Sequence, residues 1–336
     1  MSQSPHIWKM FCSTLVYPLT LLAAIVSMWP STATAERDFD DLKSLEKLVV
    51  LGDSYSRVGF TSTGTQPSAS NPFGNTATTS SGGNNWVQFL TLKYNESAFL
   101  TYDYALSGAT VNVSIIENTI GVDIVTEADT FLSAYGSNST FGGGGIIYAF
   151  WIGINDINKS YLGDDYAGID LDIYAEVIDS YYQVVSKLYD SGARNFLFLN
   201  VPPLEKAPTI LQSSSNSTKY PLMQRAVADY NEKLYKMVRQ VRHNFAYTSV
   251  FFYDAHALFD AVLADPSQYG ETASIHDTTS YCKDYASLVN NPDYKSENCS
   301  YAVDGYFWIN SLHPTWPVHQ LLAKEISALL VAGNSI

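Results

Sequence analysis

Five short apolar segments that alternate with segments of helical spacing constrain the fold of this chain more than any other feature of its sequence. Apolar runs of this length suit strands buried on both faces. Strands that alternate with helices of a dozen or more residues are typical of a parallel sheet covered by helices on both sides. We therefore expect an α/β protein, a three-layer α/β/α sandwich with a parallel sheet. The expected strands lie in "KLVVLGDS", "AFLTYDYALSGA", "IIYAFWIGIN", "NFLFLNVPP" and "SVFFYDAH".

The segments between these strands complete the expected organisation. Residues 60–85 are rich in Ser, Thr, Gly and Asn, which indicates a long surface loop. The last strand is followed by a loop that carries two cysteines. No break in composition and no internal repeat divides the chain further on, so we expect one domain over residues 36–336. Helices are expected in "NWVQFLTLKY", in "DIVTEADTFLSAYG", over residues 171–191 and 220–243, and in "WPVHQLLAKEISALLVAG".

Residues 1–35 have the order of a secretory signal peptide. Lys9 precedes the apolar run "FCSTLVYPLTLLAAIVSMW", and the small residues of "PSTATA" place a cleavage site after Ala35. A single membrane anchor is the alternative, but Pro18 interrupts the run and "ATA" fits signal cleavage. No later stretch is apolar for long enough to span a bilayer. We therefore expect a secreted, extracellular protein without stable membrane insertion.

The chain is strongly acidic. It has 33 Asp and Glu residues against 19 Lys and Arg residues, which gives a formal net charge of −14. Removal of the leader takes Lys9 with it and changes the net charge to −15. A protein of this charge has no basic field to attract nucleic acid or anionic lipid, so we expect neither as a partner. Neutral substrates or an acidic medium fit better, and the charge also favours a monomer.

Cysteines and glycosylation sequons agree with export. Cys12 leaves with the leader, and the remaining Cys282 and Cys299 are expected to form a disulfide, because an even count is typical of exported chains. Zinc binding by two lone cysteines is the less favoured alternative. The chain has six N-x-S/T sequons, and we expect N-glycosylation at some of them: Asn95, Asn112, Asn138, Asn158, Asn216 and Asn298.

Ser54 is the candidate nucleophile. It ends the motif Gly-Asp-Ser directly after the first expected strand. A serine at a strand end and at the start of a helix has backbone N–H groups nearby that can hold a developing oxyanion. The alternative is a plain helix N-cap, a role that serine also favours. The three-residue motif alone does not separate these two interpretations.

A histidine near the C-terminus is the candidate base. His313 lies in "HPTWPVH" between the last loop and the final helix, where it can take a proton from the serine and return it to the leaving alcohol. A surface histidine at a helix start is the alternative. His319, one turn inside the helix, is the competing candidate, and we expect it to be a packing residue because helix interiors do not present side chains to a loop-built site.

Two further turns supply candidate oxyanion donors. Asn155 follows the third expected strand in "GIND" and can donate a side-chain N–H, while Gly153 allows close approach of the backbone. Gly108 in "LSGA" follows the second strand and can donate its backbone N–H. Plain turns are the alternative, because Gly and Asn favour them. Carboxyl ends of parallel strands meet at one edge of a sheet, so Ser54, Gly108 and Asn155 are expected to meet there.

The motifs "GDSYS", "SGA", "GIND" and "SLHPT" occur in the order and approximate spacing of the GDSL, or SGNH, hydrolases, and the chain resembles them from about Lys47 to the C-terminal helix. It is most similar to the secreted fungal acetylesterases of carbohydrate esterase family 16, often described as cellulose-binding GDSL lipases or acylhydrolases. The resemblance implies a flavodoxin-like sheet, with Ser54 as nucleophile and His313 as base. It also implies an oxyanion hole from the N–H groups of Ser54 and Gly108 with the amide of Asn155, and neither a metal nor an organic cofactor.

One position departs from the family pattern. The family commonly has an acid three residues before the histidine, and here Asn310 takes that place. A carboxylate there orients the imidazole and stabilises its cation, and its loss from a serine protease triad lowers kcat by roughly 10⁴. Three alternatives stay open for the group that orients His313: the Asn310 amide oxygen, a backbone carbonyl, or Asp304 folded back as the acid. We place them in that order.

Other catalytic patterns fit the sequence less well. "FGGGG" and "SGGNN" lack the spacing of a dinucleotide-binding loop, and there is no G-x-S-x-G nucleophile elbow. His243, His256 and His276 have no metal-binding spacing, so we expect no metal site. The aromatic cluster "YFWINSLHPTW" suits a sugar-binding surface and a core equally well.

We therefore expect a secreted serine carboxylic ester hydrolase, and among these an acetylesterase that removes acetyl groups from hemicellulose-derived saccharides. A small ester with a short acyl group fits because the sequence has no long apolar lid segment. One alternative is a lipase or phospholipase that acts on longer acyl chains. Another is a non-catalytic carbohydrate-binding protein on the same fold, which Asn310 and the many aromatic residues would suit. The retention of Ser54, Asn155 and His313 argues against that last alternative.

Overall fold

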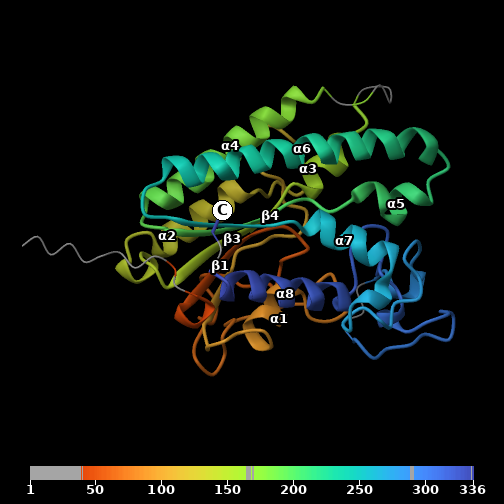
Figure 1. Ribbon diagram of the computed structural model, residues 1–336, viewed down its shortest axis with the longest axis horizontal. Helices are drawn as coiled ribbons and strands as arrows, with labels where there is room; N and C mark the ends of the chain where they lie inside the picture. Colours follow the sequence, from red (N-terminus) through yellow and green to blue (C-terminus); the bar gives the residue numbers. More distant parts are fainter. Residues whose placement is uncertain (1–38, 40, 164–167, 169, 288–290, 334) are drawn as a thin grey trace, which may run out of the picture. The chain divides into compact units, whose positions relative to one another are not determined.

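Within the residues that the structure describes, five parallel strands form one sheet (Figure 1). The structure is a computed structural model, and it describes residues 39, 41–163, 168, 170–287, 291–333, 335 and 336. The strands are β1 (Lys47–Gly52), β2 (Leu100–Asp103), β3 (Ile146–Trp151), β4 (Asn195–Leu199) and β5 (Ser249–Tyr253). Their order is β2-β1-β3-β4-β5 and each pairing is parallel. This is the flavodoxin-like order, so the expected fold class is confirmed.

The central strands are apolar because helices cover both of their faces. In β1 the four residues from Leu48 to Leu51 are fully buried, and in β3 every residue is buried. In the register of the sheet, Val49 pairs with Tyr102 of β2 on one side and with Tyr148 of β3 on the other. Burial of both faces explains why these strands are continuous apolar runs and do not alternate with polar residues.

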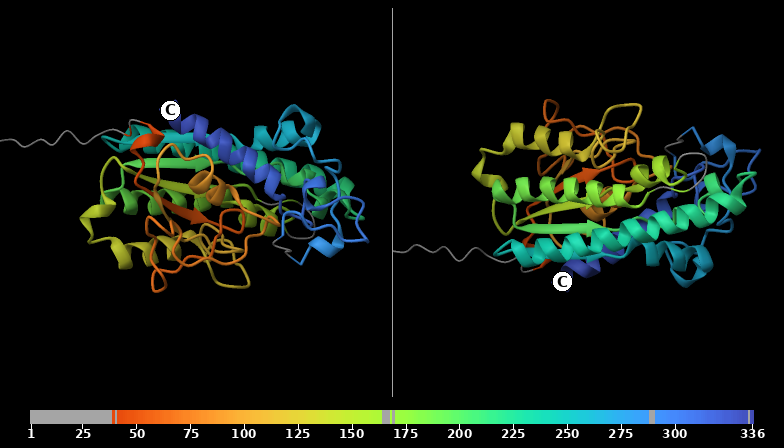
Figure 2. Two further views of the ribbon diagram at one scale, coloured as in Figure 1. Left: turned by 90° about the horizontal axis from the view of Figure 1, so that it is seen from below. Right: turned by 90° about the horizontal axis from the view of Figure 1, so that it is seen from above.

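Two layers of helices enclose the sheet (Figures 1 and 2). On one side α1 packs against α8, and α7 contacts α8; on the other, α4 packs against both α2 and α6, and α3 contacts α6. The first layer contains α1 (Trp86–Leu92), α7 (Ala255–Ala264) and α8 (Trp316–Val331). The second contains α2 (Ile124–Tyr135), α3 (Ile154–Ser160), α4 (Asp172–Asp190) and α6 (Asn216–Asn244), with the short α5 (Pro208–Leu211) nearby in the chain.

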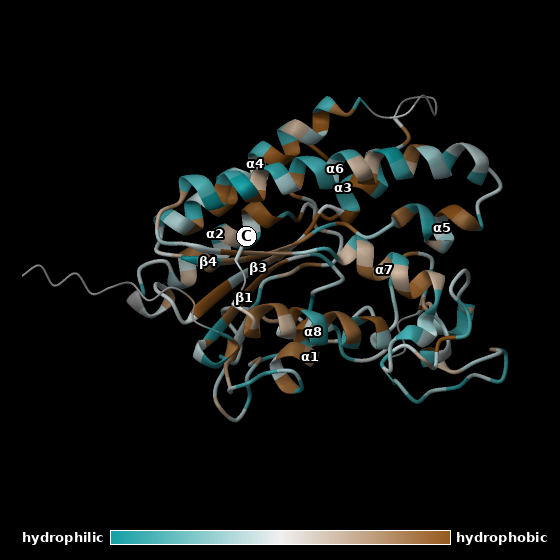
Figure 3. Cartoon of the chain, in the orientation of Figure 1, coloured by the Kyte–Doolittle hydropathy of each residue, from teal (hydrophilic) through white to brown (hydrophobic). Residues whose placement is uncertain are grey.

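Hydropathy follows these layers (Figure 3). The strands are hydrophobic, whereas α4 and α6 carry hydrophilic residues on the side away from the sheet. The buried side of α6 includes Met223, Tyr230 and Leu234. Among the helices of the described residues, none combines the length and the apolar character needed to cross a membrane.

The structure differs from the sequence-based expectation at two helices. Helix α7 lies where the sequence analysis expected a loop; it begins after Asp254, whose carboxylate accepts the N–H of Ala257 as an N-terminal cap. Helix α6 begins at Asn216 and not near Tyr220, and it contains Pro221 close to its start. Pro221 is the sixth residue of the helix, beyond the four whose N–H groups have no partner inside a helix, so it removes one backbone hydrogen bond near the N-terminal end.

Cys282 and Cys299 form a disulfide. It closes the loop between α7 and α8 around a small separate core that includes Tyr285, Val303 and Ile309. The predicted leader, by contrast, lies outside the described residues, so its processing stays a prediction.

Candidate active site

Ser54 lies in a tight turn at the carboxyl end of β1. The backbone carbonyl of Asp53 accepts hydrogen bonds from the N–H groups of Ser56 and Arg57, both at 3.0 Å. The side-chain amide of Asn85 donates to the carbonyl of Ser56 at 2.7 Å. That carbonyl therefore accepts from a side chain of the segment before α1. The segment after Ser54 is a turn, which corrects the expectation that a helix begins there.

The structure brings Ser54 and His313 together although 259 positions separate them in the sequence. Ser54 Oγ lies 2.7 Å from Nε2 of His313. The loop that carries the histidine is held by the bond from the N–H of Ile309 to the carbonyl of His313, at 2.9 Å. It is also held by the hydroxyl of Tyr55, which donates to the carbonyl of Leu312 at 2.5 Å. The residue after the serine thus anchors the residue before the histidine.

Asn310 orients the imidazole and determines its tautomer. Its side-chain oxygen accepts the backbone N–H groups of Leu312 at 3.0 Å and of His313 at 2.9 Å, which directs Oδ1, and not the NH₂ group, toward the ring. The same oxygen lies 3.0 Å from Nδ1 of His313. Nδ1 must therefore carry the proton, and Nε2 presents its lone pair to Ser54. Among the described residues, the group that accepts the Nδ1 hydrogen is the side-chain oxygen of Asn310, and not Asp304 or a backbone carbonyl.

Burial keeps both histidines of this region neutral. It lowers the pKa of His313 to about 4. Burial, together with the charge that His313 would carry, lowers the pKa of His319 to about 3. The ring of His319 packs against Tyr55 and Trp151 and is 2% exposed. The structure thus places His319 in the core, and His313 is the histidine at the serine.

Two backbone N–H groups near the serine are available as donors. Among the described residues, the N–H groups of Ser54 and Gly108 donate to no acceptor. Gly108 has a φ of +83°, a conformation that L side chains rarely adopt. A Cβ at this position would also lie 2.8 Å from Cδ1 of Ile120. The turn after β2 therefore requires glycine.

Asn155 connects the turns that follow β1 and β2. It lies in the first turn of α3, directly after β3. Its side-chain nitrogen donates to the carbonyl of Ala109 at 2.9 Å and lies 3.5 Å from Oδ2 of Asp53. The amide is therefore held between the residue after Gly108 and the residue before Ser54. The three polar turns meet at one edge of the sheet.

A family model for the GDSL-like lipases and acylhydrolases matches residues 48–326, most of the chain. The chain belongs to the GDSL lipase/acylhydrolase family. As a member of this family, it is a carboxylic ester hydrolase. The family assignment agrees with the resemblance seen in the four sequence motifs.

Two curated relatives of this GDSL hydrolase are fungal. An acetylesterase from Thermothelomyces thermophilus is 31% identical, with 92% of this chain and 95% of the relative covered. An acetylesterase from Hypocrea jecorina is 24% identical, with 94% and 97% covered. Among solved structures, an acetylxylan esterase from Geobacillus stearothermophilus has a TM-score of 0.46 at 16% identity, with 86% and 97% covered.

Sequence reasoning missed a set of buried carboxylates beneath the turns that follow β1, β2 and β3 in this GDSL hydrolase. Glu127 of α2 accepts the N–H of Gly52 at 2.8 Å with one oxygen and the N–H of Leu106 at 3.0 Å with the other. It thereby joins the ends of β1 and β2. Asp103 similarly accepts the N–H of Val58 at 2.6 Å. The sequence does contain one signal of this set, the acidic residue Asp103 within the apolar β2 segment, because a buried carboxylate must be bound by hydrogen-bond donors.

Burial raises the pKa values of these carboxyl groups. The pKa of Asp53 and of Asp156 is raised to about 7, and that of Asp103 to about 8. Burial also raises the pKa of Glu127 well above its usual value. In each case the backbone N–H groups that bind the carboxylate act in the opposite direction and lower the pKa.

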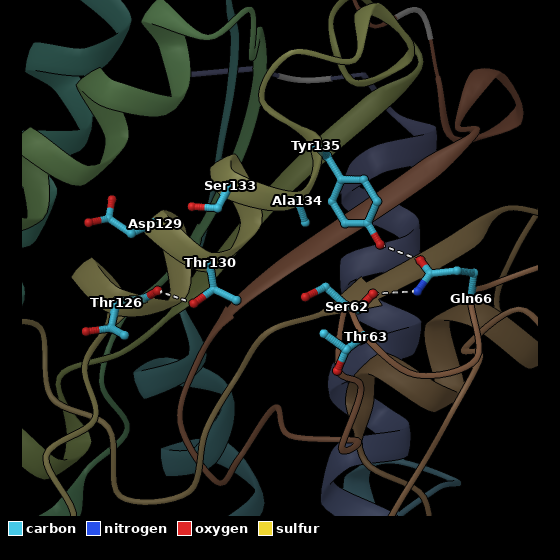
Figure 4. A pocket seen from close by; sticks show the side chains of 9 residues that line it. All are labelled: Ser62, Thr63, Gln66, Thr126, Asp129, Thr130, Ser133, Ala134 and Tyr135. Atoms are coloured by element: carbon cyan, nitrogen blue, oxygen red, sulfur yellow. Dashed lines mark hydrogen bonds between the residues drawn. The ribbon is translucent and has the colours of Figure 1, made fainter.

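A cavity of about 830 Å³ lies beside α2 (Figure 4). The loop that follows β1 forms its other wall, where the Tyr135 hydroxyl donates to the side-chain oxygen of Gln66. Ser54 and His313 do not line this cavity.

The aromatic cluster before His313 belongs mainly to the core. Tyr306, Phe307 and Trp308 are almost fully buried, as expected for the core interpretation. Trp316, at the start of α8, is partly exposed.

Proposed function

We propose that the protein is a secreted acetylesterase that removes acetyl groups from hemicellulose-derived saccharides by Ser–His catalysis. The observation that carries the proposal is the 2.7 Å contact between Ser54 Oγ and the unprotonated Nε2 of His313. Both fungal relatives are acetylesterases, which supports an acetyl group as the acyl part of the substrate. The negative charge of the protein is compatible with a saccharide substrate, because a neutral saccharide does not have to be attracted by a positively charged surface.

In the proposed mechanism Ser54 attacks the acetyl carbon while His313 accepts its proton. The tetrahedral intermediate carries a negative charge on the former carbonyl oxygen. The N–H groups of Ser54 and Gly108 stabilise that charge, and the Asn155 amide adds the N–H that its bond to the Ala109 carbonyl leaves, which lies 3.5 Å from Oδ2 of Asp53 in the free site. His313 then protonates the leaving sugar alcohol. Water, activated by the same histidine, releases acetate from the acetyl-serine.

Secretion is part of the proposal. The signal-like leader supports it, together with the disulfide between Cys282 and Cys299. Three sequon asparagines, Asn138, Asn216 and Asn298, are exposed and could accept a glycan without rearrangement of the fold.

The test is acetate release from acetylated xylo-oligosaccharides by the wild type and by Ser54→Ala. We expect release by the wild type and a loss of about 10³-fold or more in the variant. Ser70→Ala, in the exposed part of the long loop, is the matched control and should keep wild-type activity. Equal rates for the wild type and Ser54→Ala would refute the catalytic assignment.

A series of p-nitrophenyl esters tests the acyl group separately. The proposal predicts that kcat/KM is highest for the acetate and falls as the chain lengthens. A kcat/KM that rises with chain length would instead favour a lipase-type acylhydrolase.

A further inference from the structure

A second cavity lies at the N-terminal ends of α1 and α8. Its volume is about 420 Å³, within the range of pockets that bind small ligands, roughly 300–1,000 Å³. It combines aromatic side chains with a few polar groups, the usual composition of such pockets. It is lined by Gly83, Asn84, Phe89, Pro292, Asp293 and Trp316.

This pocket is attached to both catalytic segments. Trp316 is the first residue of α8 and follows His313 by three positions, which limits the distance between their Cα atoms to about 11 Å. Its backbone N–H donates to the carbonyl of Ser81 at 2.9 Å. Asn85, the residue after the lining residue Asn84, donates to the carbonyl of Ser56, two residues after the nucleophile, at 2.7 Å. The residues that line the pocket are therefore tied to the turns that carry the serine and the histidine.

Trp316 provides a fixed aromatic surface in this pocket. Its indole packs against the ring of Phe89, with centroids 6.4 Å apart, and against the small core of the disulfide loop. A Cβ on Gly83 would lie 3.0 Å from Cβ, Cγ and Cδ1 of Trp316, so a side chain there would require Trp316 to shift slightly. The indole remains partly exposed. An aromatic face of this kind suits the C–H face of a pyranose ring.

Two polar side chains at the pocket are free to bind hydroxyl groups. The side chains of Asn84 and Asp293 are exposed, and neither forms a hydrogen bond with another described residue. An acyl chain bound here would strip water from a carboxylate and an amide without giving either a partner, which is unfavourable. Sugar hydroxyls would replace the lost water. The composition of the pocket therefore favours a saccharide over an acyl chain.

We propose that this pocket is the subsite for a sugar ring of the substrate, with the pyranose stacked on Trp316 and its hydroxyl groups bound by Asn84 and Asp293. The inference rests on the proposed acetylesterase function, because it places the saccharide part of that ester. It makes these residues determinants of specificity, while Ser54 and His313 perform the chemistry.

The test compares kcat/KM for acetylated xylo-oligosaccharides with kcat/KM for p-nitrophenyl acetate, which has no sugar. For Trp316→Ala we expect the ratio of the two values to fall about tenfold, from the loss of an aromatic contact surface. For Asn84→Ala we expect a fall of about two- to tenfold, from the loss of one or two hydrogen bonds. Asn84 is exposed, so its variant does not depend on the folding of an altered core. Gln66→Ala, in the cavity of Figure 4, is the control and should leave the ratio unchanged.

Three kinetic outcomes would overturn the subsite. A proportional loss on both substrates in both variants would show that the residues only support the catalytic loops. A loss that grows with acyl length across p-nitrophenyl esters would assign the pocket to the acyl chain. A fall of the ratio in Gln66→Ala but not in Trp316→Ala would move the sugar to the other cavity.

Direct binding separates the subsite from the proposed function. If the wild type hydrolyses p-nitrophenyl acetate but releases no acetate from saccharides, the proposed function fails. Calorimetric titration of xylotriose into Ser54→Ala then decides on the subsite alone. Binding that Trp316→Ala abolishes in this background supports the subsite, and the absence of binding to Ser54→Ala overturns it.

Discussion

The side-chain oxygen of Asn310 lies 3.0 Å from Nδ1 of His313, so a neutral amide holds the proposed catalytic base in the tautomer that accepts a proton from Ser54. The amide fixes the orientation of the ring but supplies no negative charge. The imidazolium that forms during the reaction therefore lacks the stabilisation that a carboxylate at this position provides.

Asn310→Asp is expected to raise activity. Aspartate has the same shape and keeps an oxygen for the N–H groups of Leu312 and His313, so the loop should retain its structure. We expect kcat/KM on p-nitrophenyl acetate at pH 7 to rise by about tenfold or more, a fraction of the roughly 10⁴ that the carboxylate contributes in a serine protease. Asn310→Ala, which removes the acceptor, should lose activity. Unchanged or lower activity in Asn310→Asp would show that orientation alone is sufficient.

The pH dependence of the wild type should extend to acid pH. Burial lowers the pKa of His313 to about 4, so the ring is neutral and competent as a base from just above that pH upward. We expect the acid limb of kcat/KM to have its midpoint near pH 4, because this limb reports ionisation in the free enzyme. In Asn310→Asp the new negative charge favours the imidazolium, and the limb should move to higher pH. A wild-type limb near the ordinary histidine pKa of 6.5 would contradict the assignment, provided that circular dichroism shows a folded protein at each pH.

The fold was predictable because its signal is local. Leu48–Leu51 of β1 and all residues of β3 are apolar, a pattern typical of strands with both faces covered. Helix α7 was missed because the sequence analysis assigned the whole segment after β5 to the loop that carries the cysteines. Its cap at Asp254 and its apolar face were readable signals.

The candidate site was predictable in part. Ser54, Gly108 and Asn155 follow strands that are neighbours in the sheet, so topology alone brings them to one edge. The Asn310 contact depends on the path of a loop, which the sequence left open among three alternatives. Glu127 gave no local signal, because its two partners are backbone groups that lie 75 and 21 positions away.

Stability is expected to decrease from pH 6.5 to pH 8. Asp53, Asp156 and Asp103 have pKa values raised from 3.8 to about 7, 7 and 8, so at pH 6.5 they bind more protons in the folded than in the unfolded state. Their contribution to the free energy of unfolding is fully present below pH 3.8, and it is lost as the pH rises through the pKa values of the folded state. The buried histidines act in the opposite direction, because the unfolded state still binds protons on them near pH 6.5. Their effect is smaller, since about half of those protons are already lost at that pH.

Urea unfolding measures this difference. We expect a higher urea midpoint at pH 6.5 than at pH 8, with a similar slope at both. Asp103→Asn removes one of the titrating groups and should reduce the difference between the two midpoints. A midpoint that rises toward pH 8 would mean that these carboxyl groups are ionised in the folded protein throughout this range.

Glu127→Gln tests whether one buried carboxylate positions the nucleophile and the oxyanion donors together. Both oxygens of Glu127 accept backbone N–H groups, one from Gly52 at the end of β1 and one from Leu106 ahead of Gly108. Glutamine has a single acceptor oxygen, and its NH₂ group would face one of these N–H groups, so one of the two strand ends must move. A displacement of about 1 Å at a catalytic group can cost roughly 10²-fold in rate, and we expect a loss of that order in kcat with little change in KM for p-nitrophenyl acetate. Glu117→Gln, at an exposed position between β2 and α2, is the matched control and should behave as the wild type. Loss of stability without a fall in kcat of the folded fraction would instead limit Glu127 to a structural role.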